Sequence, residues 1–206
     1  MRALVVTNMY PTPERPASGP FVRDQVEALR RRGDVEVELF HFRAGSRNYP
    51  RAARELRRRY RPGQFDVVHV HFGLVAWPAL LAGLRPLVVT LHGNDLLHPR
   101  SRPFTRAALP FVAVPAAVSR AFSRNVPGAA RTRRVAILPC GVDLARFRPI
   151  PRAEARARLG LDPSGPYLHP SRSTLGARCD HVRRENIRGS ARWRKRRGSL
   201  RHRSLG

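Results

Sequence analysis

Short apolar runs separated by amphipathic stretches recur along the first 168 residues of the chain. The run Leu87–Leu91 is apolar or β-branched at every position, which is typical of a strand buried on both faces of a parallel sheet. Similar runs predict further strands at Ala3–Thr7, Val35–Phe42, Phe65–His71, Phe111–Ala117 and Arg134–Leu138, and the start of another at Pro166–Leu168.

Stretches with helical periodicity lie between these runs. Pro20 is expected at the first position of one helix, where its missing N–H costs nothing, and Gly33 is expected to end that helix. Further helices are predicted at Arg51–Arg61, Leu74–Leu84, Phe104–Leu109, Arg120–Asn125 and Arg152–Leu159. Ser119 is expected to cap the helix that begins at Arg120. The repeated alternation of strand and helix predicts an α/β fold with a Rossmann-like, doubly wound parallel sheet.

The hydrophobic pattern stops near residue 168. Net charge over the whole chain is +26, and between Ser171 and the last residue twelve basic residues accompany only Asp180 and Glu185. Such a composition cannot bury a core, so we expect residues 169–206 to be a disordered basic tail. Three parts are therefore predicted, namely a folded domain over 1–150, a linker helix with the start of an incomplete second domain over 151–168, and the tail.

Two interpretations of the tail compete. It is either a genuine basic segment that binds nucleic acid or anionic lipid, or the product of a truncation or frameshift that replaced a second domain. The abrupt loss of pattern inside an expected strand favours the second interpretation.

Polar residues and glycines gather where the predicted strands end. Ligands of parallel sheets bind outside the carboxyl ends of the strands, so these exits are where we expect a binding site. The candidate residues are Ser18 and Gly19 after the first strand, His71 at the third, His92, Gly93 and Asp95 after the fourth, and Gly141 and Asp143 after the sixth.

Each candidate also has a purely structural interpretation. His92 would then satisfy loop carbonyls and His71 would pack at a strand end. Asp95 would brace its own loop, and Asp143 would cap the following turn. The glycines would serve backbone geometry alone.

The sequence lacks the motifs of several kinds of binding site and the signals for secretion or membrane insertion. The glycine-rich signatures of dinucleotide and P-loop sites are absent, and so is the G-x-S-x-G of esterases. Cys140 and Cys179 make neither a disulfide framework nor a zinc site, and we expect no metal and no cofactor. No signal peptide or membrane span is visible, so we expect a cytoplasmic protein. The basic helix Arg51–Arg61 adds peripheral association with the inner, anionic face of the membrane as a further prediction.

Five motifs together resemble a known family, the retaining glycosyltransferases of family 4, which have the two-domain GT-B fold. In chain order they are L-V-V-T-N-M-Y-P with S-G-P-F-V, F-D-V-V-H-V-H, V-V-T-L-H-G-N-D, A-V-S and I-L-P-C-G-V-D-L-A-R-F. The resemblance implies that residues 1–150 form the N-terminal, acceptor-binding domain. It also implies that Gly19 lies against the donor diphosphate or the acceptor, and that His92 is the catalytic residue beside the transferred sugar. Cys140 departs from the family pattern, in which asparagine is usual.

The resemblance further implies the reaction. A sugar would pass from a nucleotide diphosphate sugar to a glycan or lipid-linked acceptor, without a required metal. The family's arginine–lysine pair and E-x7-E motif belong to the second domain, and this sequence has neither. We therefore expect this chain to be inactive alone. The alternative function is that of a basic nucleic-acid-binding protein acting through the tail.

Overall fold

The computed structural model describes residues 1–127 and 135–165. The chain divides into two compact units, Met1–Arg148 and a second that begins at Pro149. The predicted boundary at residue 150 stays a prediction. The predicted strand at Pro166–Leu168 and the basic tail lie outside the described residues.

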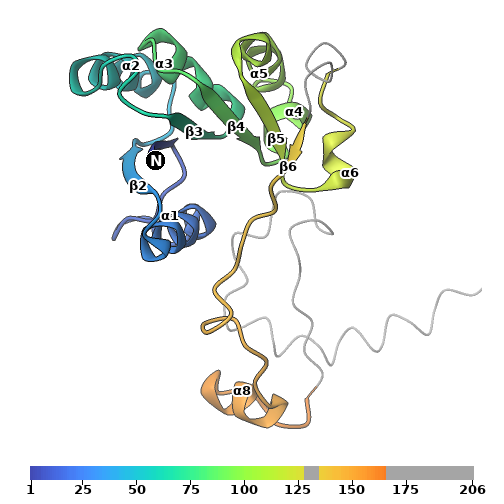
Figure 1. The fold of residues 1–206 in the computed structure, drawn as a ribbon. Coiled ribbons are helices and arrows are strands. Elements are labelled where there is room, and N and C mark those ends of the chain that lie inside the picture. The colour runs from blue at the N-terminus through green and yellow to red at the C-terminus, as the bar shows by residue number, and fades with distance from the viewer. Residues whose placement is uncertain (128–134, 166–206) are drawn as a thin grey trace, which may run out of the picture. The chain divides into compact units, whose positions relative to one another are not determined.

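A parallel sheet of six strands forms the centre of the first unit (Figure 1). In chain order the strands are β1 Arg2–Thr7, β2 Glu36–His41, β3 Val67–His71, β4 Leu87–Leu91, β5 Val114–Ala117 and β6 Ala136–Ile137. Their spatial order is β2-β1-β3-β4-β5-β6, so the winding reverses at β1. The α/β fold and the Rossmann-like parallel sheet are confirmed.

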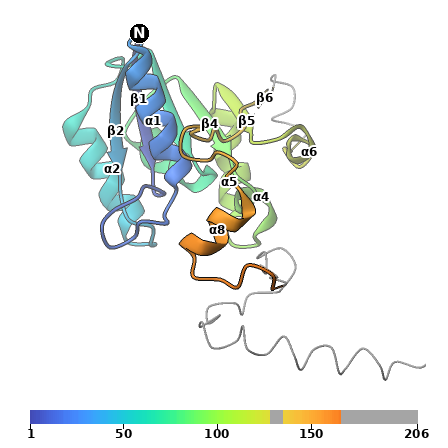
Figure 2. The same cartoon turned by 90° about the horizontal axis from the view of Figure 1, so that it is seen from below.

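Helices connect the strands of this sheet. They are α1 Pro20–Arg32, α2 Asn48–Arg59, α3 Ala76–Leu81, α4 Asn94–Leu97, α5 Arg102–Ala108 and α6 Arg120–Ser123, with 3-10 turns at Gly73–Val75 and Leu109–Phe111. Helix α1 covers one face of the sheet, whereas α2, α3 and α5 cover the other (Figures 1 and 2). The reversal of winding at β1 explains this asymmetry, because right-handed crossovers in opposite directions place their helices on opposite faces.

Predicted helix ends agree with the structure where a glycine or a capping side chain marks the end. Gly33 ends α1 in the left-handed conformation (φ 80°). The Ser119 hydroxyl accepts a hydrogen bond from the Phe122 amide at 3.1 Å and so caps α6. Other bounds were wrong by several residues. The fifth strand begins at Val114 rather than Phe111, because Leu109–Phe111 is a 3-10 turn that contains Pro110.

Helix α4 was not predicted at all. The sequence indicated a loop after the fourth strand, but the chain turns directly into a helix of four residues, Asn94–Leu97. A single turn is too short to show helical periodicity in the sequence.

Two apolar clusters hold the unit together. The larger one joins the α2, α3 and α5 face of the sheet to its helices and includes Leu4, Leu56, Val70 and Leu91, all without solvent exposure. The smaller one lies under α1 and consists of Val5, Val22, Val26 and Val37.

The second unit contains one described helix, α8 Arg152–Arg158, where a helix was predicted. The Arg156 guanidinium donates hydrogen bonds to the carbonyls of Pro163 and Gly165, which fold the following turn back onto the helix.

Candidate functional site

The exits of β3 and β4 lie side by side at the carboxyl edge of the sheet. His71 is the last residue of β3 and pairs in register with Thr90, while His92 follows β4 directly. The ring nitrogens His71 Nδ1 and His92 Nε2 are 3.1 Å apart and share a hydrogen bond. Two of the predicted site residues are thus in direct contact.

Asp95 ties these two exits together. Its side chain has no solvent exposure. One carboxylate oxygen accepts the Gly73 amide at 2.5 Å, and the other accepts the amides of His92 at 2.5 Å and Gly93 at 3.1 Å. This geometry favours the bracing interpretation of Asp95, because its oxygens face backbone N–H groups. Burial raises the pKa of Asp95, and the three amides oppose that shift.

The backbone between the two exits is strained. Phe72 follows β3 with φ 81°, a conformation that normally requires glycine. A side chain on Gly73, the next residue, would place its Cβ 2.3 Å from the Thr105 methyl group. Strain of this kind persists only where the surroundings hold it, and it concentrates at functional sites.

Three imidazoles form a continuous row at this edge. His69 Nε2 lies 2.8 Å from the Thr90 hydroxyl, and its ring centroid lies 4.4 Å from that of His71. His71 in turn stacks on His92 at 5.4 Å, and the ring of Phe21 of α1 packs against His92 with the ring centroids 5.0 Å apart. His71 Nε2 is buried and has no partner among the described residues.

All three imidazoles are neutral at pH 7. Burial lowers the pKa of His69 and of His92 to about 4, and it lowers the pKa of His71 well below the ordinary value. Neighbouring imidazoles add to the shift of His71 and His92, since a second positive charge nearby is unfavourable. His92 Nε2 is engaged with His71, so the nitrogen of the neutral ring that can donate a hydrogen bond to a ligand or accept one from it is Nδ1.

The loop after β1 brings Gly19 to the start of α1. Gly19 is buried and left-handed (φ 61°), and a Cβ there would lie 2.4 Å from the Met9 carbonyl oxygen. Backbone geometry therefore requires glycine here. Ser18 is half-buried, and its amide donates to the Arg15 carbonyl at 3.1 Å.

The segment that follows β6 also contacts His92. Cys140 Sγ lies 3.7 Å from His92 Nδ1, so the residue that departs from the expected motif contacts the predicted catalytic histidine. Asp143 accepts the amides of Ala145 at 2.9 Å and Arg146 at 3.3 Å, which is the turn-capping geometry. Arg146 forms an ion pair with Asp24 of α1 at 2.5 Å. Gly141 has open space where a side chain would stand.

A family model for Glycosyltransferase Family 4 matches residues 3–146 of the chain. The chain belongs to glycosyltransferase family 4. The match spans all six strands of the sheet and every predicted site residue, so the family resemblance of the motifs is confirmed.

Curated relatives of the chain are named D-inositol 3-phosphate glycosyltransferase. That of Actinosynnema mirum is 34% identical over 132 residues, which are 53% of this chain and 30% of the relative. That of Nocardia farcinica is 35% identical over 126 residues, 52% of this chain and 28% of the relative. That of Rhodococcus jostii is 32% identical over 165 residues, 71% of this chain and 33% of the relative. The matched part of the chain thus spans a third or less of these relatives' length.

This family-4 site contains residues that the sequence interpretation missed. His69 stands two residues before His71, and the two-residue period of a strand puts both on one face of the sheet. That period was a usable signal. Phe21 directly follows Pro20, but nothing in the sequence indicates that its ring meets a histidine seventy-one positions later.

Residues 1–127 and 135–165 show neither a metal-binding cluster nor a membrane-spanning helix. No group of three or more His, Cys, Asp or Glu residues in this part of the chain is placed to hold a metal ion. None of its helices combines the length and apolar character needed to span a bilayer. The predicted contact of the tail with nucleic acid falls on residues outside these ranges and stays a prediction.

Proposed function

We propose that residues 1–150 form the acceptor-side domain of a retaining glycosyltransferase that uses a nucleotide diphosphate sugar. The acceptor is a hydroxyl group on a glycan or lipid-linked molecule, or on a phosphorylated polyol like that in the relatives' name. Both substrates bind at the carboxyl edge of the sheet. His92 is the proposed catalytic residue, and Ser18, Gly19, His71, Gly93, Gly141 and Asp143 are proposed binding residues around it.

The placement of His92 carries this proposal. Its backbone is fixed by the Asp95 carboxylate, and its ring packs against the rings of His71 and Phe21. Because burial keeps the imidazole neutral, it can donate or accept a hydrogen bond without placing a full charge beside the transferred sugar. A side chain held by such contacts has little reorganisation to undergo when the transition state forms.

The departing nucleoside diphosphate needs stabilisation as negative charge develops on it. Preorganised donors supply such stabilisation in enzymes. We propose that in the whole protein most of these donors belong to a second domain, and that the chain of 206 residues is inactive alone.

A chimera tests this function. Residues 3–146 of this chain would replace the matching part of the Actinosynnema mirum relative, and sugar transfer would be measured with a panel of nucleotide sugars and acceptors. We expect the chimera to transfer a sugar and the 206-residue chain to show no turnover. His92→Ala in the chimera should lower kcat roughly 100-fold, the typical cost of losing one preorganised donor. An unchanged kcat would contradict the role of His92, and turnover by the isolated chain would contradict the need for a second domain.

A second proposal concerns helix α2. Arg47, Arg51, Arg54 and Arg58 recur at intervals of four, three and four residues, so they form one stripe along the helix. None of the four has an ion-pair partner among the described residues, whereas Ala52, Ala53 and Leu56 bury the opposite side. This arrangement supports peripheral binding to an anionic membrane, where each arginine contributes about 1 kcal/mol.

Vesicle co-sedimentation tests the membrane proposal. The chain should bind vesicles that contain anionic lipid, and Arg54→Gln/Arg58→Gln should weaken that binding by roughly tenfold or more. Binding that is indifferent to anionic lipid content would overturn it.

A further inference from the structure

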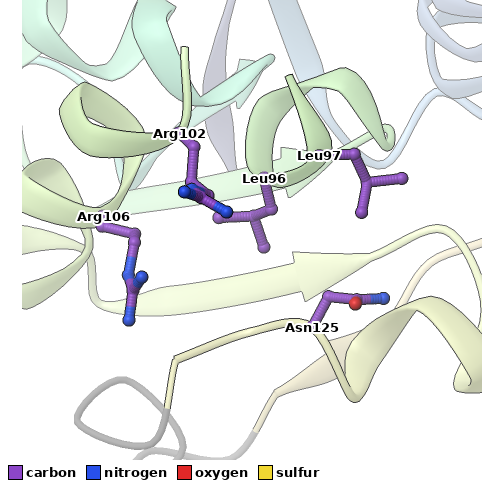
Figure 3. Close-up of a pocket in the computed structure, with 5 residues that line it drawn as sticks. All are labelled: Leu96, Leu97, Arg102, Arg106 and Asn125. Atoms are coloured by element: carbon purple, nitrogen blue, oxygen red, sulfur yellow. The ribbon is translucent and has the colours of Figure 1, made fainter. Parts of the chain in front are cut away.

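A small pocket opens beside α4 and α5, and none of the three histidines lines it (Figure 3). Leu96 and Leu97 of α4 form its apolar side, and Arg102 and Arg106 project into it from α5. Asn125, just after α6, lines it from the opposite side. The cavity volume is about 250 Å³.

The two arginines stand one helical turn apart on the same element. Two positive charges at this spacing repel each other and destabilise the helix, so their placement has a cost. Neither guanidinium has a hydrogen bond or an ion pair within residues 1–127 and 135–165. Both guanidiniums are therefore available to bind a ligand.

The surrounding elements supply no counter-charge. Residues 96–127 contain five arginines and no aspartate or glutamate. Asp95, which immediately precedes this stretch, already holds three backbone amides. The potential in the pocket is thus positive, and like-signed charges lining a concave surface concentrate anions there.

The size and chemistry of the pocket restrict what it can hold. Sites for drug-sized ligands occupy about 300–1,000 Å³, so this cavity suits one group of a ligand better than a whole sugar nucleotide. Two guanidiniums match the oxygen geometry of phosphate, to which arginine donates paired hydrogen bonds. One amide hydrogen of Asn125 is used by the Phe122 carbonyl, which leaves a second hydrogen for a phosphate oxygen.

We propose that Arg102, Arg106 and Asn125 form a subsite for a phosphomonoester group of the acceptor. The assignment of this group to the acceptor rests on the proposed function. Helix α4 begins two residues after His92, so the subsite and the histidine belong to the same edge of the sheet. An acceptor whose phosphate occupies the pocket is tethered at that edge, and its hydroxyl is oriented by the tether.

Phosphate binding by the full 206-residue chain tests the subsite without any sugar transfer. Inorganic phosphate, D-inositol 3-phosphate and unphosphorylated inositol would be titrated by calorimetry and by amide NMR at low salt. We expect the two phosphate compounds to bind at one saturable site and to shift the amide signals of Leu97 and Asn125. Arg102→Gln/Arg106→Gln should weaken this binding roughly 10- to 100-fold, because it removes charge-assisted hydrogen bonds.

The matched control is Arg54→Gln/Arg58→Gln on α2. It removes the same charge at the same spacing, and it should leave phosphate affinity within about twofold if the site is local. Equal losses in the two double variants, or shifts spread over all basic surfaces, would overturn the proposal. The wild-type NMR map keeps this test decisive even if the Arg102/Arg106 variant folds poorly.

Phosphatidylcholine vesicles with and without phosphatidate distinguish the source of the phosphate. The vesicle arm uses chains that carry Arg54→Gln/Arg58→Gln, so that the α2 stripe does not bind the vesicles. In that background, loss of phosphatidate binding on adding Arg102→Gln/Arg106→Gln would assign the subsite to a lipid phosphate, whereas loss of inositol phosphate binding alone would assign it to a soluble acceptor. Failure of all phosphate binding would refute the subsite and leave the transfer assay of the chimera, which does not depend on it, unaffected.

Discussion

The two faces of the sheet are built by the same strands but differ in chemistry. The face covered by α2, α3 and α5 carries only apolar side chains along its inner strands, namely Leu4, Val6, Val68, Val70, Val89 and Leu91. On the α1 face, register pairing places Val5, His69 and Val88 side by side in the middle of the strands, and the polar residues Thr7, His71 and Thr90 at their carboxyl ends.

One face of the sheet therefore contributes mainly to stability, and the other carries the groups that can bind a ligand. Successive residues of a strand point to opposite faces, so a single strand can supply a dry core on one side and hydrogen-bonding groups on the other. The polar groups occur at the carboxyl edge, where a parallel sheet binds ligands. Substitutions on the two faces should therefore have effects of different size and kind.

The largest effect on stability is expected on the apolar face. Leu91 has no solvent exposure, and Leu91→Ala would leave a cavity in the larger cluster. We expect the free energy of unfolding to fall by about 2–5 kcal/mol. Leu144→Ala is the control, since Leu144 is 75% exposed and should change stability by less than about 0.5 kcal/mol. Urea denaturation measures both, and equal small effects would contradict the placement of the core.

Asp95→Ala should be nearly as costly, although Asp95 is polar. The change leaves three backbone amides, of Gly73, His92 and Gly93, without their acceptor in a buried place. We expect a loss of about 2–4 kcal/mol, since a buried group left unpaired costs about 1–3 kcal/mol. Asp143→Ala, which removes a half-buried turn cap, should cost about 1 kcal/mol or less. Equal losses for the two variants would show that Asp95 does not brace the exits.

Gly19→Ala should have a smaller effect on the free energy of unfolding. Comparison with Gly33→Ala separates the cost of a positive φ from the cost of the new Cβ contact. Both residues have positive φ, so each alanine incurs about 1 kcal/mol of backbone cost. Only at Gly19 would the new Cβ also meet the Met9 carbonyl, whereas Gly33 has open space. We expect Gly19→Ala to be more destabilising than Gly33→Ala in urea denaturation. A reversed order would contradict the close approach of the two loop segments.

The histidine row predicts how stability changes with pH. The pKa of each of the three imidazoles is lower in the folded chain than its ordinary value of 6.5, so the unfolded chain binds more protons in this range. Stability should be fully present above pH 6.5 and fall as the pH decreases towards 4. His69→Gln should reduce the slope of unfolding free energy against pH. A wild-type protein equally stable at pH 7 and pH 4.5 would contradict the burial of the row.

Much of this fold was predictable because its patterns are local. The apolar runs located every strand, and Pro20, Gly33 and Ser119 located helix ends through chemistry that acts within a few residues. The neighbouring exits of β3 and β4 also followed from the rule for parallel sheets. That rule predicts that His71 and His92 lie at one edge of the sheet, where the structure shows them in contact.

The contacts within the site were less predictable because they join distant parts of the chain. The ring of Phe21 on His92, and Cys140 beside the same imidazole, depend on how α1 and the β6 exit pack. Bracing of its own loop by Asp95 was among the sequence interpretations, but its Gly73 partner was not foreseen, since it comes from another strand exit. The Arg102 and Arg106 pair is visible in the sequence, but only packing shows that it lines a pocket.

The central claim is that His92 lines the substrate-binding edge of this family-4 domain. Side-chain NMR of the full chain tests it directly, with UDP, GDP and D-inositol 3-phosphate added in turn. Binding at the edge should shift the imidazole signals of His92 most. It should shift those of His69 least, because His69 lies two residues before His71 in β3 and so further from the edge. Signals of His92 that no compound moves, or shifts confined to His69, would contradict the claim.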